Sequence, residues 1–428
     1  MKKRIMAILL SVAMVATMLA GCGNAAGGAS AGGVQEITWM FWDDLNATED
    51  LISLGYKDTI ERFNKDYEGK YHVTPITTNL EEYYPKLNAL VAAGETPDMF
   101  IVSPGPNLDV YVDPGVAADL TSYLEADGWV DTFNGGKNAF SQQTYDGKIY
   151  AVPLNIAAAC VFYNTEMFAD AGITEMPTDW EGLMAACQAL QDKGYTPLTI
   201  SAGTAWCLSM LAGYICDSEG VDLDAIDAGT AHWTDANVVS AATKLIEISK
   251  YFQPTAAGDT NDVATANFYN EEAAMLIQGS WAIGQMNGAN AAIEDKCGVF
   301  AFPGTGGRVI AKSDSLAMSS STKNPEAVIA LMKYFTDDTA QKYTAEVGGK
   351  IPVTTVEYDA AKAPAQLEYV MDVFGNASST FGFYNESLAS TEAGETFDNA
   401  MVAIFLGEEI EPSLQTIEDF YTNNVWNK

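Results

Sequence analysis

The stretch LEEYYPKLNALVAAGETPDMFIVS, residues 80–103, carries the signals of a helix, a stop and a strand in close succession. Gly94 is typical of a helix end, and Pro97 prevents the helix from continuing. The apolar run at 99–102 then predicts a buried strand. The apolar residues that recur before it at helical spacing are Tyr83, Leu87, Leu90 and Val91.

The same elements occur earlier in the chain. ITWMFW, residues 37–42, is a short apolar and aromatic run that predicts a buried strand, and residues 49–67 follow it with helical spacing. Alternating strands and helices indicate α/β layers with mainly parallel sheets. The chain beyond residue 33 is long enough for two or three domains.

The amino-terminal residues predict export. Three basic residues at positions 2–4 precede an apolar run at 5–20, as in a secretory signal peptide. Leu19-Ala20-Gly21-Cys22 resembles the lipobox of bacterial lipoproteins, which implies cleavage of residues 1–21 and a lipid on Cys22. The alternative is an uncleaved membrane helix, although the run is short for a span of about 20 residues.

Residues 23–33 contain little besides Gly, Ala and Ser, so they are expected to form a flexible linker after the lipidated Cys22. The anchor would hold the folded part at the outer face of the cell membrane, on the extracellular or periplasmic side.

The charge balance excludes several kinds of partner. The formal net charge of −35 argues against nucleic acid and against anionic lipid surfaces. After Arg4 the chain has only Arg62 and Arg308, and sites for phosphate or carboxylate ligands favour arginine, so a neutral ligand is expected. His72 and His232 lie far apart and no CxxC pair occurs; no metal or other cofactor is predicted.

Five cysteines follow Cys22, an odd number that cannot all pair. Cys187 falls in an apolar helical stripe and is expected to be a buried small hydrophobe. A bridge between Cys207 and Cys216 remains open, because nothing in their spacing demands it.

A resemblance to a known family becomes specific at TYDGKIYAVPLNIAAACVFYNTEMFADAGI, residues 144–173. This segment resembles the extracellular solute-binding proteins of ABC sugar importers, the maltodextrin-binding-like group. Further segments follow that group's order: AAGETPDMFIV, MPTDWEGLMAACQAL, AAMLIQGSWAIG, VFAFPG and GGKIPVT. Each segment is a weak signal by itself, but together they extend the similarity over nearly the whole mature chain.

The resemblance implies two α/β lobes of the periplasmic-binding-protein type, with the ligand in the cleft between them. The chain would cross between the lobes near 155–160, 303–314 and 355–370. Lobe 1 is then expected to comprise residues 34–155 plus about 310–360, and lobe 2 residues 156–309 plus about 361–428.

Sugar chemistry indicates which side chains such a cleft needs. A pyranose stacks its C–H face on an aromatic ring, and its hydroxyls bind carboxylates and amides. Residues of these types at strand ends and in loops are therefore candidates. The candidate ligand-binding residues are Trp42, Asp43, Asp44, Ser103, Asn107, Asn155, Trp206, Trp281, Arg308, Asp314, Phe383, Tyr384 and Asn385.

Several candidates have a structural alternative. Trp281 matches a family position whose aromatic ring stacks on sugar, but it could instead pack between the lobes. Asp44 could be a cap, Asn155 could satisfy hinge backbone, and Arg308 could form an interlobe ion pair. Trp206 could pack on the core. Residues 156–159 are small and apolar where some family members carry an acidic ligand residue, which argues against maltodextrin specificity.

Two other functional classes share features with this sequence. A secreted glycosidase also needs aromatics and carboxylates, but the sequence has no Gly-x-Ser-x-Gly elbow, metal cluster or P-loop. A surface adhesin or a sensor input subunit would use the same cleft. The sequence favours a non-enzymatic, monomeric binding protein that delivers a neutral di- or oligosaccharide to ABC permease subunits with a cytoplasmic ATPase.

Overall fold

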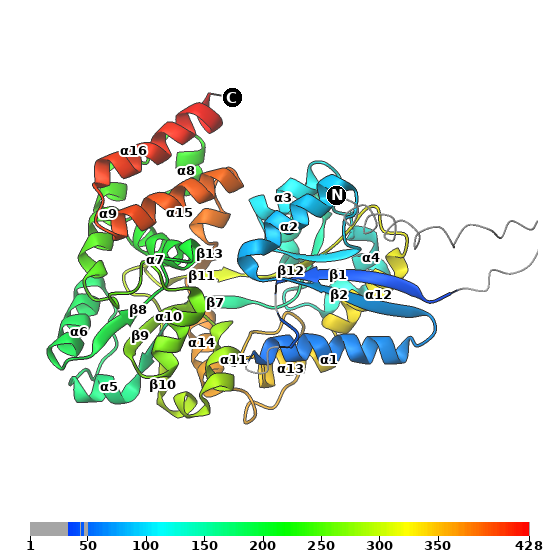
Figure 1. Cartoon of the computed structure of the whole chain (residues 1–428), viewed down its shortest axis with the longest axis horizontal. Helices are drawn as coiled ribbons and strands as arrows, with labels where there is room; N and C mark the ends of the chain where they lie inside the picture. The colour runs from blue at the N-terminus through cyan, green and yellow to red at the C-terminus, as the bar shows by residue number, and fades with distance from the viewer. Residues whose placement is uncertain (1–32, 43, 47–49, 428) are drawn as a thin grey trace, which may run out of the picture.

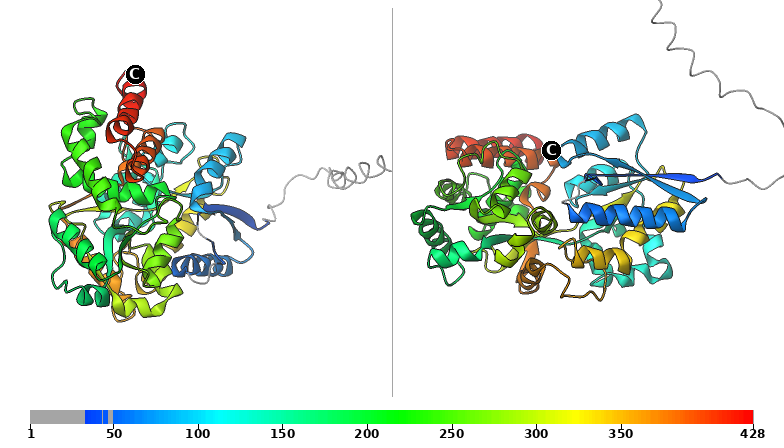
Figure 2. Two further views of the ribbon diagram at one scale, coloured as in Figure 1. Left: turned by 60° about the vertical axis from the view of Figure 1, so that its left-hand side comes forward. Right: turned by 60° about the horizontal axis from the view of Figure 1, so that its bottom comes forward.

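Two separate β-sheets organise the chain in the computed structural model, which describes residues 33–42, 44–46 and 50–427. Figure 1 shows each sheet within its own lobe, one coloured blue to cyan with part of the yellow chain and the other mainly green to red. The right-hand view of Figure 2 also shows the lobes side by side. The chain therefore has the two-lobed α/β architecture that the sequence predicts.

The first lobe is built on a five-stranded sheet of order β2-β1-β3-β12-β6. Its strands are β1 (Gln35–Phe41), β2 (Tyr71–Thr77), β3 (Met99–Val102), β6 (Ala151–Pro153) and β12 (Ser315–Met318). Its helices are α1 (Leu51–Asp66), α2 (Leu80–Ala93), α3 (Pro106–Val112), α4 (Thr121–Glu125), α12 (Pro325–Phe335) and α13 (Asp338–Glu346), with the short turns η1 (Ala126–Thr132) and η2 (Gly136–Gln143) and the hairpin β4 (Thr144–Tyr145)–β5 (Lys148–Ile149). In Figure 1, α1 lies on one side of β1 and β2, and α2 lies on the other.

Residues 80–103 form the elements that their sequence predicts. The Asn79 side chain caps α2 by accepting a hydrogen bond from the Glu82 N–H at 2.8 Å. Gly94 ends the helix in the left-handed conformation, with φ of 73°. The Tyr83 hydroxyl then donates to the Ile101 carbonyl at 2.6 Å, which fixes α2 against the fully buried strand β3.

The second lobe is built on a six-stranded sheet with the path β13-β11-β7-β9-β8, from which β10 also pairs with β7. Its strands are β7 (Ala157–Asn164), β8 (Thr196–Thr199), β9 (Ala273–Gly279), β10 (Cys297–Phe300), β11 (Arg308–Lys312) and β13 (Ser379–Phe381). Its helices and turns are α5 (Thr165–Asp170), α6 (Trp180–Asp192), α7 (Ala205–Ser218), α8 (Leu223–Asp227), α9 (Ala236–Ser249), α10 (Asn261–Tyr269), α11 (Ala282–Ala289), η3 (Ala291–Lys296), α14 (Ala365–Gly375), η4 (Tyr384–Glu386), α15 (Thr391–Phe405), α16 (Ile410–Tyr421) and η5 (Thr422–Trp426).

The prediction of mainly parallel sheets is wrong in detail, because both sheets are mixed. In the first sheet β1 is parallel to β2 and β3, whereas β12 is antiparallel to β3 and β6. In the second sheet β7 is antiparallel to β9, β10 and β11. Parallel strands need a crossover connection such as a helix, whereas β6, β7, β11 and β12 adjoin short connections that pass between the sheets.

Two of these connections lie side by side. The first runs from the end of β6 at Pro153 to the start of β7 at Ala157, and the second runs from Lys312 to Ser315. The Leu154 N–H donates to the Asp314 carbonyl at 2.8 Å, so the two connections are hydrogen-bonded directly. Ile156 also exchanges two backbone hydrogen bonds with Ile351, at 2.9 and 3.1 Å, which adds a third segment to the junction.

A buried glutamine on α13 joins the same segments. The Gln341 side chain is fully buried, and its Nε2 donates to the Leu154 carbonyl at 3.0 Å and to the Phe335 carbonyl at 2.9 Å. Its Oε1 accepts from the Val353 N–H at 2.8 Å. The buried Gln341 side chain thus provides hydrogen-bond partners for backbone groups of two connecting segments, at Leu154 and Val353.

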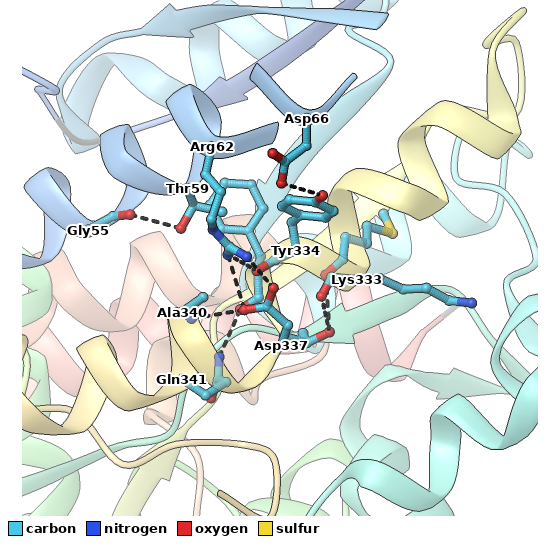
Figure 3. Close-up of polar contacts among 12 residues, drawn as sticks. Gly55, Thr59, Arg62, Asp66, Lys333, Tyr334, Asp337, Ala340 and Gln341 are labelled. Carbon is cyan, nitrogen blue, oxygen red and sulfur yellow. Dashed lines mark hydrogen bonds and ion pairs between the residues drawn. The ribbon is translucent and has the colours of Figure 1, made fainter. Parts of the chain in front are cut away.

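An arginine holds α13 in place within the first lobe (Figure 3). Arg62 on α1 donates from Nη2 to the Tyr334 carbonyl at 3.1 Å and to Oδ1 of Asp337 at 3.0 Å. Asp337 also caps α13 by accepting from the Ala340 N–H at 3.0 Å. Arg62 therefore has a structural role. It holds the start of α13, the helix that carries Gln341 to the junction.

The five cysteines in the described part of the chain are free and buried. Cys207 and Cys216 do not pair, and Cys187 lies in the core of the second lobe as predicted. Among the described residues, no helix combines the length and the apolar character required to cross a membrane.

Replacing Gln341 by alanine should destabilise the protein. The change leaves the Leu154 carbonyl and the Val353 N–H buried without this partner, and each loss costs about 1–3 kcal/mol. Urea unfolding followed by circular dichroism should show a lower midpoint. The matched control is Thr339→Ala, an exposed position on the same helix; an equal loss in both variants would contradict the role of Gln341.

Candidate functional site

Three aromatic rings from separate parts of the second lobe meet at its boundary with the first. Trp206 lies in the first turn of α7, Trp281 follows β9, and Phe383 precedes η4. The ring centroids are 5.8 Å apart for Trp206 and Trp281, 6.3 Å for Trp206 and Phe383, and 5.9 Å for Trp281 and Phe383. We call Trp206, Trp281 and Phe383 the aromatic cluster.

A glycine makes room for the largest ring of this cluster. A Cβ atom at Gly279 would lie 1.9 Å from Cζ3 of Trp281, far inside van der Waals contact. The Trp281 indole therefore lies directly against the backbone of β9. Any larger residue at position 279 would displace the indole from the aromatic cluster.

Both indoles of the aromatic cluster carry an unused hydrogen-bond donor. Nε1 of Trp206 and Nε1 of Trp281 are buried and have no acceptor among the described residues. Trp39 and Trp233 share this feature, but both are fully buried in lobe cores, whereas Trp206 and Trp281 remain partly exposed. Burying an unpaired donor is costly, so a ligand oxygen that reached either nitrogen would relieve that cost.

A lysine connects the aromatic cluster to the first lobe. Nζ of Lys312 lies 3.3 Å from Oγ of Ser103, 3.4 Å from Oε1 of Glu386 and 3.6 Å from Oδ1 of Asp314. The same ammonium lies 5.3 Å from the ring centroid of Phe383. We call Lys312, Glu386, Asp314 and Ser103 the lysine cluster.

The ammonium of the lysine cluster stays charged. Burial lowers the pKa of Lys312, but the Glu386 and Asp314 carboxylates outweigh burial, so the pKa is raised overall. The loop that carries Glu386 also touches the first lobe, because a Cβ atom at Gly105 would lie 2.5 Å from the Glu386 carbonyl oxygen. The two lobes are therefore in close backbone contact at this point.

Aromatic residues extend the site into the first lobe. The Ser103 N–H donates to the Tyr84 hydroxyl at 3.1 Å, and the Tyr84 ring lies 6.3 Å from Trp42. Burial raises the pKa of Tyr84 to about 12, and Glu386 contributes to the rise, so its hydroxyl stays protonated. Rings and polar groups thus run from Trp42 in one lobe to Trp206 in the other.

A buried acid supports the loop that carries Phe383 and Glu386. Nδ2 of Asn385 donates to Oδ2 of Asp398 on α15 at 3.0 Å. A Cβ atom at Gly394 would lie 2.1 Å from the Asn385 carbonyl oxygen, so this loop packs directly on α15. Burial raises the pKa of Asp398 to about 6, and Glu386 and Glu395 add to the rise.

The structure brings together Trp42, Ser103, Trp206, Trp281, Asp314 and Phe383 of the predicted residues, in the contacts given above. Asn155 is buried in the first connection, where its Nδ2 donates to the Tyr56 hydroxyl at 3.3 Å and its Oδ1 has no hydrogen-bond partner in the described part of the chain. Asn107 is half-buried at the start of α3. Asp43 and Cys22 lie outside the described residues.

The remaining predicted residues make contacts elsewhere. Asp44 accepts from the Asn46 N–H at 2.9 Å within a turn, and it caps no helix, because α1 begins at Leu51 with Asp50 as its cap. Arg308 pairs with Asp217 and lies 5.0 Å over the Phe381 ring. Both of these partners belong to the second lobe, so the expected interlobe ion pair is not formed. Tyr384 is buried in the core and donates to the Val221 carbonyl at 3.3 Å.

Sequence reasoning missed Lys312, Glu386 and Tyr84. Lys312 ends the strand that leads into the second connection, and Glu386 directly follows the predicted Asn385. The chain has few basic residues. A lysine in the crossing predicted near 303–314 could therefore have been chosen as a candidate site residue. Tyr84 follows Tyr83 in the predicted helix but lies outside its apolar stripe, and nothing in the sequence marks it as a ligand residue.

The fold and the candidate site define a class of protein, namely a two-lobed binding protein with an aromatic and polar site at the junction of its lobes. No group of His, Cys, Asp and Glu able to hold a metal ion occurs among the described residues.

Comparisons with known proteins give the family. Residues 58–369 match the bacterial extracellular solute-binding protein family. The multiple sugar-binding protein of Streptococcus mutans is 25% identical over 363 residues, which cover 76% of this chain and 83% of that protein. A probable sugar-binding periplasmic protein of Mesorhizobium japonicum is 26% identical over 313 residues, covering 69% and 73%.

Solved structures share the fold. A chitin oligosaccharide binding protein superposes with a TM-score of 0.84 at 23% identity, covering 93% of this chain and 100% of that one. The maltose-bound MalE3 of T. maritima gives 0.76 at 21% identity, covering 91% and 100%. The chain belongs to the bacterial extracellular solute-binding protein family. It is the substrate-binding component of an ABC transporter and not an enzyme, which confirms the resemblance seen in the sequence.

The stability of this site should depend on pH through Asp398. Its native pKa is raised, so the native state holds a proton that the unfolded state releases, and stability falls as pH rises from about 4 to about 6. Asp398→Asn should therefore stabilise the protein at pH 7.5 by up to about 3 kcal/mol relative to the wild type.

Urea unfolding at pH 7.5 and pH 4.5 checks this expectation. The gain from Asp398→Asn should shrink by about 1 kcal/mol or more at the lower pH. Asp131→Asn, at an exposed position, is the matched control and should show no such dependence. An identical gain at both pH values would contradict the role of Asp398.

Proposed function

We propose that this protein captures a neutral carbohydrate, a di- or oligosaccharide, outside the membrane and delivers it to the permease. The observation that carries this proposal is the aromatic cluster with its two unpaired indole donors beside the lysine cluster. Sugar rings present C–H faces for stacking and oxygens for such donors. The names of the sugar-binding relatives support the same ligand class.

The candidate site suggests how capture would work. Trp42, Tyr84 and Ser103 belong to the first lobe, whereas Trp206, Trp281 and Phe383 belong to the second. A ligand that touches both sets binds the closed arrangement more tightly than an open one, and this difference in affinity favours closure. The connections around Leu154 and Asp314 are the segments about which the lobes would move.

The partners and the location form part of the proposal. The ligand-bound protein would dock as a monomer on ABC permease subunits that are driven by a cytoplasmic ATPase. A lipid on Cys22 would hold it at the outer face of the cell membrane, with residues 23–33 as a linker. The lipobox-like segment 19–22 supports this anchor.

Substitutions at Trp281 test the ligand site. Trp281→Ala should weaken binding at least tenfold, because it removes both the stacking face and the Nε1 donor, while Trp281→Phe should lose less. A thermal-shift screen of neutral mono-, di- and oligosaccharides finds the ligand, since ligand at about 100 times its dissociation constant adds roughly 2.7 kcal/mol to the native state. Calorimetry then compares the variants.

The matched control is Trp180→Ala on α6, whose indole donates to Oε2 of Glu247 at 3.0 Å away from the aromatic cluster. Binding should be unchanged in this variant. Wild-type affinity in Trp281→Ala would remove Trp281 from the site. A sugar that is recovered cleaved would contradict the binding role.

Substitution of the predicted lipidation site tests the anchor. Cys22→Ser removes the thiol that receives the lipid, so any variant protein from which residues 1–21 have been cleaved should appear in the soluble extracytoplasmic fraction, while the wild type sediments with membranes. Globomycin, which blocks the lipoprotein signal peptidase, should leave the precursor uncleaved in the wild type. Membrane retention of a processed Cys22→Ser protein would show that something other than this lipid holds it.

A further inference from the structure

The lysine cluster contains more negative than positive charge. Lys312 supplies one ammonium, and Glu386 and Asp314 supply two carboxylates within 3.6 Å of it. All three residues are largely buried, with side-chain exposures of 18% for Lys312, 20% for Glu386 and 10% for Asp314. Charges this far removed from water are screened much less than charges on the surface.

The charge of the ammonium is balanced within the protein. Nζ of Lys312 donates to Ser103 Oγ and to Glu386 Oε1, and it lies 3.6 Å from Asp314 Oδ1, which is an ion pair without a hydrogen bond. The Phe383 ring centroid lies 5.3 Å from the same ammonium. An incoming carboxylate would therefore meet a cation whose charge two carboxylates already offset.

Further acids surround the same place. Asp398 lies behind Asn385, whose amide it binds at 3.0 Å. On the first lobe, Asp109 interacts with Tyr145, whose hydroxyl donates to the Gly105 carbonyl at 3.4 Å. Arg308, the nearest arginine in sequence, is engaged by Asp217. A ligand carboxylate would therefore meet like charges, while Arg308 and Lys312 are already paired with acids of the protein.

We propose that Glu386 and Asp314 make this site selective for uncharged glycans and exclude sugars that carry a carboxylate, because they neutralise Lys312 within the protein. This inference rests on the proposed function and deepens it by naming the residues that set the ligand's charge. Lys312 serves as the positioning group that holds both carboxylates at the site. Removing one carboxylate leaves the charge of the ammonium less offset within the protein, so a uronic acid meets less repulsion at the site.

The experiment compares matched ligands by calorimetry. The neutral probes are cellotriose, maltotriose and N,N′,N″-triacetylchitotriose, and each has counterparts with C6 of one ring oxidised to a carboxylate, one ring at a time. For the neutral probe that binds, the wild type should bind at least one carboxylate form tenfold or more weakly. The ratio of the affinity for the neutral probe to the affinity for its carboxylate form should fall at least fivefold in Glu386→Gln. Asp314→Asn should also lower this ratio.

Glu181→Gln is the matched control, because it removes one carboxylate from an exposed position on α6 and should leave the ratio unchanged. Equal wild-type affinity for neutral and carboxylate forms would overturn the inference. A ratio that stays within twofold of the wild type in both Glu386→Gln and Asp314→Asn would also overturn it. Absence of binding to every neutral probe, with the protein folded, would instead overturn the proposed function on which the inference rests.

Discussion

The junction of the connecting segments is the constraint on which the rest of the structure depends. Leu154 and Asp314 are hydrogen-bonded to each other, Ile156 pairs with Ile351, and Gln341 binds the backbone of Leu154 and Val353. All of these residues except the half-buried Ile156 are buried, so their backbone groups must find partners inside the protein. The junction therefore fixes where β7 and β12 start, and with them the orientation of both sheets.

The candidate site follows from this arrangement. Lys312 is the last residue of β11, where the second connection begins, and it faces Ser103, the residue after β3. Glycines at positions 105, 279 and 394 allow a loop, an indole and a helix to approach backbone more closely than any other residue permits. The site is thus built by close backbone contact as much as by the side chains that line it.

Several parts of the fold could be predicted because their signals are local. The helix that ends at Gly94 and the strand at 99–102 follow from apolar spacing, Gly94 and Pro97, all within one short stretch. The mixed pairing of the sheets could not be predicted in this way. Whether β12 lies antiparallel to β3 depends on residues more than two hundred positions apart, which local patterns do not report.

The sequence by itself determined the export signal, the acidic and arginine-poor composition, the α/β alternation and the family resemblance. It also pointed to Trp206, Trp281 and Phe383, because aromatic residues in loops after strands are suited to sugar. Only the tertiary structure decided that Arg308 pairs within its own lobe, that Tyr384 belongs to the core, and that Lys312 joins Glu386 and Asp314. The physical reason is that the charge and hydrogen bonding of a buried group depend on the neighbours that folding brings within a few ångströms, and those neighbours come from distant parts of the chain.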